Sequence, residues 1–191
     1  MDLNGYFDPV SLERPRFGYL HETDTFSHHI SVHTPDLPIR ELDTHQVALI
    51  GIPEDAGGCI KGSSDAPDQI RSQLYRLRKM NRNIRIYDLG NLKKSGHIND
   101  TYFALRDILL ELMEHRISVI LLGGSQDLSR GVFLALEKTE GIHQVLTVDS
   151  MLDFSKEVED PINSRNYLNQ LLHPAGNKTF SYINLRHQGC F

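Results

Sequence analysis

The chain has 191 residues, of which 39% are hydrophobic, and this share is enough for the buried core of one domain without disulfides or a structural metal. The net charge is −5, and the lysines and arginines are scattered singly along the sequence, so they do not predict a basic face that could neutralise a row of phosphates. We therefore expect no nucleic-acid partner. Two distant cysteines, no apolar segment of membrane-spanning length and no signal pattern predict a cytoplasmic protein that makes no membrane contact.

Residues 1–45 are predicted to form an irregular N-terminal arm, rich in Pro, Asp, Thr and His, with one short strand around residues 29–32. Its histidines lack the i, i+4 pairing of helical metal ligands, so we expect solvated side chains there. These histidines are His21, His28, His29, His33 and His45.

Residues 46–191 are predicted to form an α/β domain that begins with a buried strand over residues 47–52. A helix starts at Asp65-Ala66-Pro67, followed by a strand over residues 84–89 and a turn at Gly90-Asn91. A longer helix runs from Asn99 or Asp100 to about His115. Periodicity predicts apolar faces made of Ile70, Leu74 and Leu77 on the first helix, and of Phe103, Leu105, Ile108, Leu109, Leu112 and Met113 on the second.

The same alternation continues towards the C-terminus. Strands are predicted over residues 118–122, 144–148 and 180–185, and helices over residues 128–138 and 167–172. This order predicts a three-layer α/β/α fold with a mainly parallel sheet. Because no covering helix follows the last predicted strand, we expect an incomplete fold, in which either a longer natural chain or a homo-oligomer covers the exposed sheet edge.

Polar motifs follow four of the predicted strands, at the carboxyl ends where ligands bind in open α/β sheets. They are Gly51-Ile52-Pro53-Glu54-Asp55, Asp88-Leu89-Gly90-Asn91, Gly123-Gly124-Ser125-Gln126-Asp127 and Asp149-Ser150-Met151-Leu152-Asp153.

The last two motifs resemble the Gly-Gly-Asp-His-Ser and Asp-Ala-His-x-Asp segments of the arginase–agmatinase–formiminoglutamase (ureohydrolase) family. Upstream, residues 51–53 are similar to the family's Gly-x-Pro loop, residues 66–71 to its Gly-Pro-x-x-Ile-Arg helix start, and residues 87–91 to its Asp-x-Gly segment. The four similarities occur in consistent order. The resemblance therefore implies that residues 46–191 are the N-terminal portion of an arginase-like α/β domain.

Family members hold two Mn²⁺ ions whose bridging hydroxide attacks a guanidinium or amidine carbon. In this chain the two family histidines fall on Gln126 and Met151, and only the carboxylates Asp149 and Asp153 remain. A thioether is too soft for Mn²⁺, and a neutral amide is a weak substitute for imidazole. The resemblance therefore implies a degenerate binuclear site, no catalytic residue and no cofactor in this chain, with manganese expected only if the family activity is retained.

Two further positions resemble the Ser-Gly-Asn loop that contacts substrate in arginases. They are Ser164 and Asn166, which the resemblance makes substrate-binding candidates, although Leu168 replaces the histidine that follows in the family.

Other interpretations of these residues stay open. Asp149 and Asp153 are also typical turn caps, and Gln126 and Asp127 are typical residues at a helix start. The chain is either an inactive family member, a part of a working Mn-dependent hydrolase of formiminoglutamate, agmatine or arginine in a longer parent chain, or a module that binds a small anion or nucleotide at Gly123-Gly124.

Overall fold

The computed structural model describes residues 1–11, 22–59, 61–79, 83–155, 161–172 and 180–185. Its larger sheet has five strands, with β4 beside β3, β3 beside β5, and β1 and β2 both paired with β4. All its pairs are parallel except β1 with β4. The strands are β1 (Phe7–Asp8), β2 (Ser31–Val32), β3 (Val47–Gly51), β4 (Ile86–Leu92) and β5 (Ser118–Leu122).

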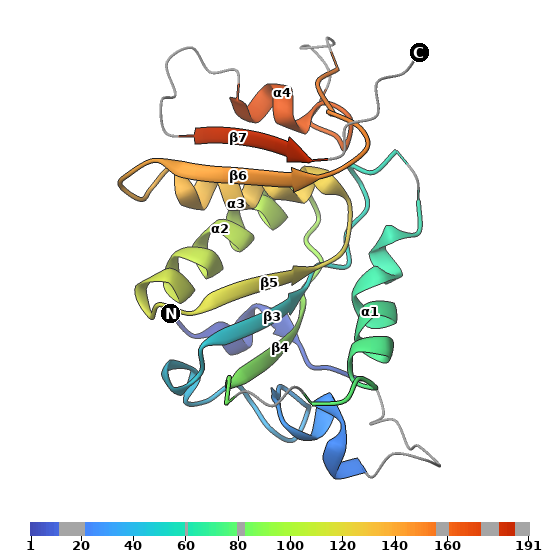
Figure 1. Cartoon of the computed structure of the whole chain (residues 1–191), viewed down its shortest axis with the longest axis vertical. Helices are drawn as coiled ribbons and strands as arrows, with labels where there is room; N and C mark the ends of the chain where they lie inside the picture. Colours follow the sequence, from blue (N-terminus) through green and yellow to red (C-terminus); the bar gives the residue numbers. More distant parts are fainter. Residues whose placement is uncertain (12–21, 60, 80–82, 156–160, 173–179, 186–191) are drawn as a thin grey trace.

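A second, smaller sheet pairs β6 (His143–Val148) with β7 (Phe180–Leu185) in parallel. In the described residues, β5 and β6 are not hydrogen-bonded to each other, and Figure 1 shows the two sheets one above the other. The predicted α/β fold with a mainly parallel sheet is confirmed, and it is divided into two sheets.

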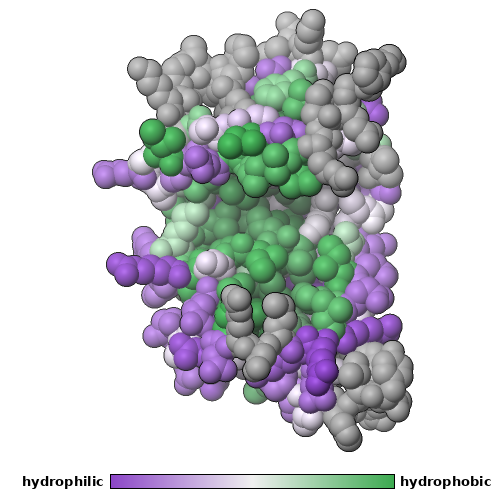
Figure 2. Space-filling view, viewed as in Figure 1, coloured by the Kyte–Doolittle hydropathy of each residue, from purple (hydrophilic) through white to green (hydrophobic). Residues whose placement is uncertain are grey.

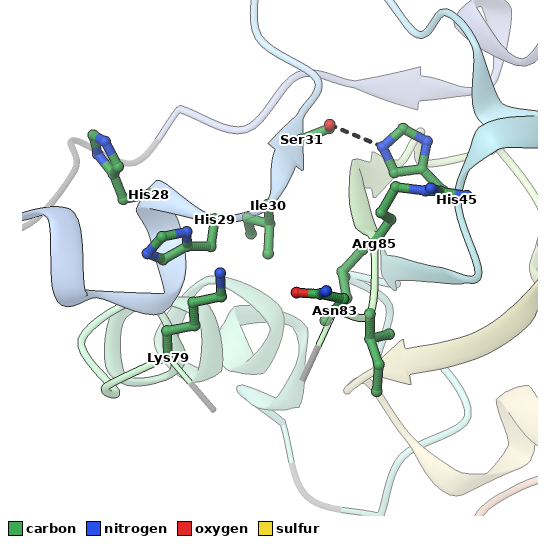
Figure 3. A pocket seen from close by; sticks show the side chains of 10 residues that line it. His28, His29, Ile30, Ser31, His45, Lys79, Asn83 and Arg85 are labelled. Carbon is green, nitrogen blue, oxygen red and sulfur yellow. Dashed lines mark hydrogen bonds between the residues drawn. The ribbon is translucent and has the colours of Figure 1, made fainter. Parts of the chain in front are cut away.

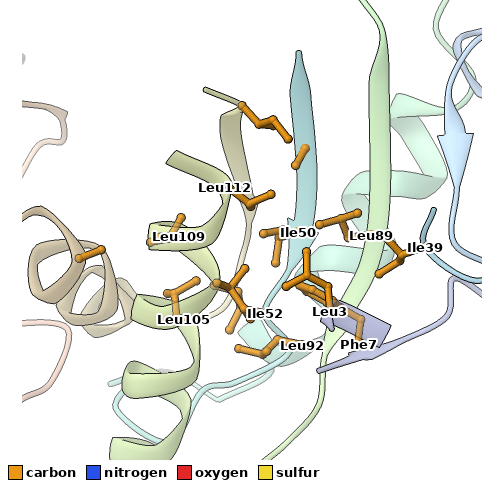
Figure 4. Packing of buried hydrophobic residues seen from close by; sticks show 14 of the residues in the cluster. Leu3, Phe7, Ile39, Ile50, Ile52, Leu89, Leu92, Leu105, Leu109 and Leu112 are labelled. Atoms are coloured by element: carbon orange, nitrogen blue, oxygen red, sulfur yellow. The ribbon is translucent and has the colours of Figure 1, made fainter. Parts of the chain in front are cut away.

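The larger sheet is covered by α1 (Ala66–Leu74) and α2 (Ile98–Glu114). The helix α3 (Ser129–Leu136) packs against α2, and α4 (Tyr167–Leu172) packs against α3 and the smaller sheet. Ile50 and Leu89 pack in the same cluster as α2, whereas the neighbouring Asp88 bonds to α1. Because successive side chains of a strand point to opposite faces, α1 and α2 lie on opposite sides of the sheet, as Figure 4 shows.

The main core lies between the larger sheet and α2. Leu105 and Leu112 of α2 are fully buried, and Figure 4 shows Leu105, Leu109 and Leu112 along the helix face turned towards β3. Phe103, expected in this core, is 47% exposed, and the Arg106 guanidinium lies 5.0 Å from its ring centre. At 100° per residue, Phe103 turns away from the stripe that contains Tyr102 and Leu105.

The predicted apolar face of α1 is wrong. Ile70 and Leu77 are 42% and 57% exposed, and the side chain of Arg71 is buried instead. Arg71 Nε and Nη2 donate to the two carboxylate oxygens of Asp88 over 2.8 and 2.9 Å, and the Tyr75 hydroxyl donates to Asp88 Oδ2 over 2.9 Å. Paired charges of this kind tolerate burial that a single charge would not.

The N-terminal segment joins the sheet. Leu3 and Phe7 are buried in the main core, and β1 pairs with the end of β4 through Phe7 with Leu92 and Asp8 with Asn91. His33, expected in solvent, is buried, and its Nδ1 lies 3.0 Å from Leu89 O.

The remaining local differences concern where elements begin and end. The expected turn at Gly90-Asn91 lies inside β4, which continues to Leu92 because β1 pairs with these residues. Among the helices that the structure describes, none is long and apolar enough to cross a membrane.

Candidate functional site

The loops after β3 and β5 meet at the carboxyl end of the larger sheet. Ile52 N donates to Leu122 O and Ser125 N donates to Glu54 O, both over 3.0 Å. Gly124 has a φ of 96°, and a methyl group there would lie 2.6 Å from Glu54 O. The Gly-Gly turn therefore lets the backbones of the two loops approach closely. This close approach explains why glycine stands here, and no bound anion is needed to explain it.

Asp127 is fully buried beneath these loops and accepts a 2.5 Å hydrogen bond from the Tyr102 hydroxyl at Oδ2. Burial raises the pKa of Tyr102, and the hydrogen bond to Asp127 raises it further. Gln126 and Asp127 were interpreted as residues at a helix start, and they lie in a 3₁₀ turn, Gln126–Leu128, that leads directly into α3. The Asp127 carboxylate connects that turn to α2.

Gln126 and Asp149 are brought together although 23 residues separate them. Gln126 Nε2 donates to Asp149 Oδ2 over 2.6 Å, and Met151 N donates to Asp149 Oδ1 over 2.9 Å. Both oxygens of this carboxylate therefore accept hydrogen bonds from the chain itself, and the bond from Met151 N forms an Asx turn. The Met151 side chain is 57% exposed.

Asp153 lies close enough to Asp149 for their charges to interact. It has a left-handed backbone, with a φ of 44°. Partial burial raises the pKa of Asp153, and the negative charge of Asp149 adds to this shift. Burial also raises the pKa of Tyr167, and the charge of Asp153 contributes. The two aspartates therefore lie near each other, with the buried Tyr167 beside them.

Ser164 and Asn166 differ in what they contact. Ser164 N donates to Gly57 O over 2.9 Å, and the Ser164 hydroxyl donates to Cys59 Sγ over 3.2 Å. Asn166 is buried, accepts from Asn163 N over 2.7 Å and donates to Pro161 O over 3.2 Å. Ser164 therefore borders the loop after β3, whereas Asn166 shapes its own loop.

The contact between Ser164 and Cys59 was not foreseen. Cys59 is exposed, and its N–H also donates to Ser164 Oγ over 3.2 Å. Because 105 residues separate the two positions, no local sequence pattern could have indicated the pair.

The residues present do not fit a pair of hard divalent ions. Asp149 and Asp153 supply two carboxylates. At the family's histidine positions, the Gln126 amide donates to Asp149, and Met151 has an exposed thioether, so neither position supplies an imidazole ligand. In the described part of the chain, no group of three or more His, Cys, Asp or Glu side chains is placed to hold a metal ion. The carboxylates of Asp149 and Asp153 can accept hydrogen bonds or pair with one positively charged group.

Comparison with known proteins gives the wider context. Residues 45–187 match the family model of the Arginase family. Formimidoylglutamase of Hahella chejuensis is 29% identical over 123 residues, which are 59% of this chain and 38% of that protein.

Solved structures share the fold. Formiminoglutamase of Trypanosoma cruzi with Mn²⁺ superposes with a TM-score of 0.68 at 21% identity, over 79% of this chain and 55% of that one. Formimidoylglutamase of Bacillus subtilis gives a TM-score of 0.72 at 19% identity, over 91% and 56%. The chain thus spans about half the length of these two structures.

Proposed function

Because the chain belongs to the Arginase family, we propose that it is a formiminoglutamase-like protein whose binuclear metal site is degenerate and which is catalytically inactive in this chain. On this proposal its role is in binding, assembly or regulation. No catalytic residue is assigned, and Asp149 and Asp153 are the residual positions of the family's metal site.

One observation carries the proposal, namely the hydrogen bond from Gln126 Nε2 to Asp149 Oδ2 at 2.6 Å. An imidazole at position 126 would offer a nitrogen lone pair to a metal ion. The amide instead turns its N–H towards the carboxylate and occupies an oxygen that a metal ion would need. Two carboxylates cannot by themselves hold two ions and lower the pKa of a bridging water.

The alternative is a Mn-dependent hydrolase of linear amidines, such as formiminoglutamate, agmatine or arginine, in a longer parent chain. The Trypanosoma cruzi structure contains Mn²⁺, and the present chain covers only 55% of it. On this reading the missing ligands come from polypeptide beyond these 191 residues. A small-anion or nucleotide site at Gly123-Gly124 is less favoured, because the turn packs against Ala66 and Glu54.

Metal content tests the proposal directly. We expect the purified chain, stripped of metal and then titrated with Mn²⁺, to bind no stoichiometric manganese by electron paramagnetic resonance and to leave formiminoglutamate, agmatine and arginine unchanged. Two bound Mn²⁺ ions in the unmodified chain, held by Asp149 and Asp153, would refute it. Turnover by a longer natural protein with Mn²⁺ would establish the alternative.

A matched pair of variants tests whether the two replaced histidines are the cause of the lost manganese binding. Restoring both imidazoles with Gln126→His and Met151→His is expected to create measurable Mn²⁺ binding, because two nitrogen ligands then join two carboxylates. Adding Asp149→Asn to this double variant should abolish the gain. Equal manganese binding with and without the histidines would show that the replaced residues are not the reason for the loss.

A further inference from the structure

A cavity of about 560 Å³ lies at the amino ends of the parallel strands, the end of the sheet opposite to Asp149 and Gln126. Ser31, where β2 begins, and Ile86, where β4 begins, both line it, as does His45 just before β3 (Figure 3). Its size falls within the roughly 300–1,000 Å³ of sites that hold small molecules.

The lysine and arginine that line this cavity are not balanced by a described acidic residue. Lys79 and Arg85 line it together with His29 and His45, and none of the described lining residues is an aspartate or glutamate, although the chain as a whole carries a net charge of −5. Figure 3 shows Lys79 and Asn83 extending towards the same open space. Ammonium, guanidinium and amide N–H groups are all donors, so the cavity is suited to an anion.

Two of these side chains are held in place by neighbours. Arg85 Nε donates to Thr44 O, and His45 Nε2 lies 2.9 Å from the Ser31 hydroxyl. Figure 3 shows the Arg85 guanidinium beside His45, across the cavity from Lys79, and Lys79 lines the adjoining apolar cavity as well.

An apolar cavity of about 190 Å³ adjoins the cationic one. The two share His29, Ile30, Lys79, Ile84 and Ile86 as lining residues. Phe26, Leu74 and Leu77 complete the apolar wall. Leu77 and Ile84 are 57% and 47% exposed, so a ligand tail would remove apolar surface from water.

We propose that the two adjoining cavities form one binding site for an amphipathic carboxylate, with its acid group at Lys79 and its apolar tail against Leu77 and Ile84. A bare oxyanion would leave the apolar cavity empty, and an uncharged apolar molecule would leave the Lys79 ammonium unpaired. The site lies away from the strand-end loops, so it does not depend on whether the metal site is active.

Binding of octanoate tests the proposal, with octanol as the tail without charge and acetate as the charge without tail. Isothermal titration of the 191-residue chain should give one octanoate per chain, with octanol and acetate each at least about tenfold weaker, because each loses one half of the contacts. Lack of octanoate binding by the folded protein would overturn the proposal.

Variants locate the site. Lys79→Gln, and separately Leu77→Ser, should each weaken octanoate binding by about tenfold or more. The matched controls are Lys138→Gln and Leu146→Ser, which change an exposed cation and an exposed leucine elsewhere and should leave the affinity unchanged. Equal affinity in the charge variant and the unmodified chain, or loss in the Leu146→Ser control, would place binding elsewhere and refute the assignment. Circular dichroism checks that every variant is folded.

Discussion

At the scale of single residues, the buried pair of Tyr102 and Asp127 connects α2 to the turn that carries Gln126. Their side chains are shielded from water, and the Tyr102 hydroxyl is the donor to Asp127 Oδ2. Asp127 Oδ1 has no hydrogen-bond partner among the residues that the structure describes. Removing the tyrosine hydroxyl would therefore leave the carboxylate without a donor from the described chain, and buried charges without donors are costly.

Tyr102→Phe is expected to lower the free energy of unfolding by about 1.5–3 kcal/mol at neutral pH, the usual range for a hydrogen bond to a charged group. Because the pKa of Tyr102 is raised in the fold above its ordinary value of 10.0, the stability it confers is complete below pH 10 and is lost as the pH rises further. The difference in the free energy of unfolding between Tyr102→Phe and the unmodified chain, measured by urea denaturation, should therefore become smaller above pH 10.

The matched control for this experiment is Tyr6→Phe, at a partly buried tyrosine. We expect it to cost less stability than Tyr102→Phe. A Tyr102→Phe protein as stable as the unmodified chain at neutral pH would contradict the role given to the pair.

At the scale of elements, β4 is the strand on which the N-terminal segment depends. It pairs with β3 on one side, and with β2 and β1 on the other. Gly90 in β4 has a φ of 93°, and a methyl group there would lie 2.1 Å from Asp8 O in β1. Glycine at this position therefore permits both the left-handed backbone and the close approach of β1.

Gly90→Ala is expected to separate β1 from β4 while the rest of the sheet stays folded. The hydrogen bond from Lys93 N to Tyr6 O, at 2.9 Å, should break, so hydrogen exchange of the Lys93 amide should become faster. Gly62→Ala is the matched control, because Gly62 has a φ of 102° with no atom within 4 Å of an added methyl group. Exchange at Lys93 that is no faster in Gly90→Ala than in Gly62→Ala would contradict the role given to the contact with Asp8.

At the scale of the whole molecule, one face of β5, β6 and β7 is apolar and exposed. Val145 and Tyr182 pack towards Phe133 of α3, whereas Leu146 and Val148, which alternate with Val145 along β6, are 59% and 70% exposed. Ile120, Ile183 and Leu185 are exposed as well. Figure 2 shows apolar side chains gathered across β5 and β6, a patch of the kind that marks an interaction surface.

The 191-residue chain is expected to self-associate through this face, whereas the sequence predicted a homo-oligomer that covers an exposed sheet edge. The double variant Leu146→Lys with Val148→Lys should reduce association, because burying two unpaired lysine charges in the interface is unfavourable in free energy. Sedimentation velocity over a range of concentrations measures this. The control is Leu37→Lys, at a leucine that is 62% exposed in the N-terminal segment. A monomer at every concentration would contradict the expectation.

The sequence by itself determined the order and type of most elements. Strands expected over residues 118–122 and 180–185 and the short helix over 167–172 have the expected bounds, and the fold class is confirmed. Apolar runs and helical periodicity are local properties, so they can be recognised without knowing what packs against them. The motifs after β3, β5 and β6 were likewise recognisable, because their order along the chain matches that of a family.

The tertiary structure alone decided what those residues do. Ile70 and Leu77 were expected to face the core, yet Arg71 is the buried side chain, because Asp88 lies on the facing strand. Gln126 reaches Asp149, and Ser164 reaches Cys59, across 23 and 105 residues respectively. Such contacts depend on how strands and helices are placed in space, and the free energy of a buried polar group depends on partners that no local pattern contains.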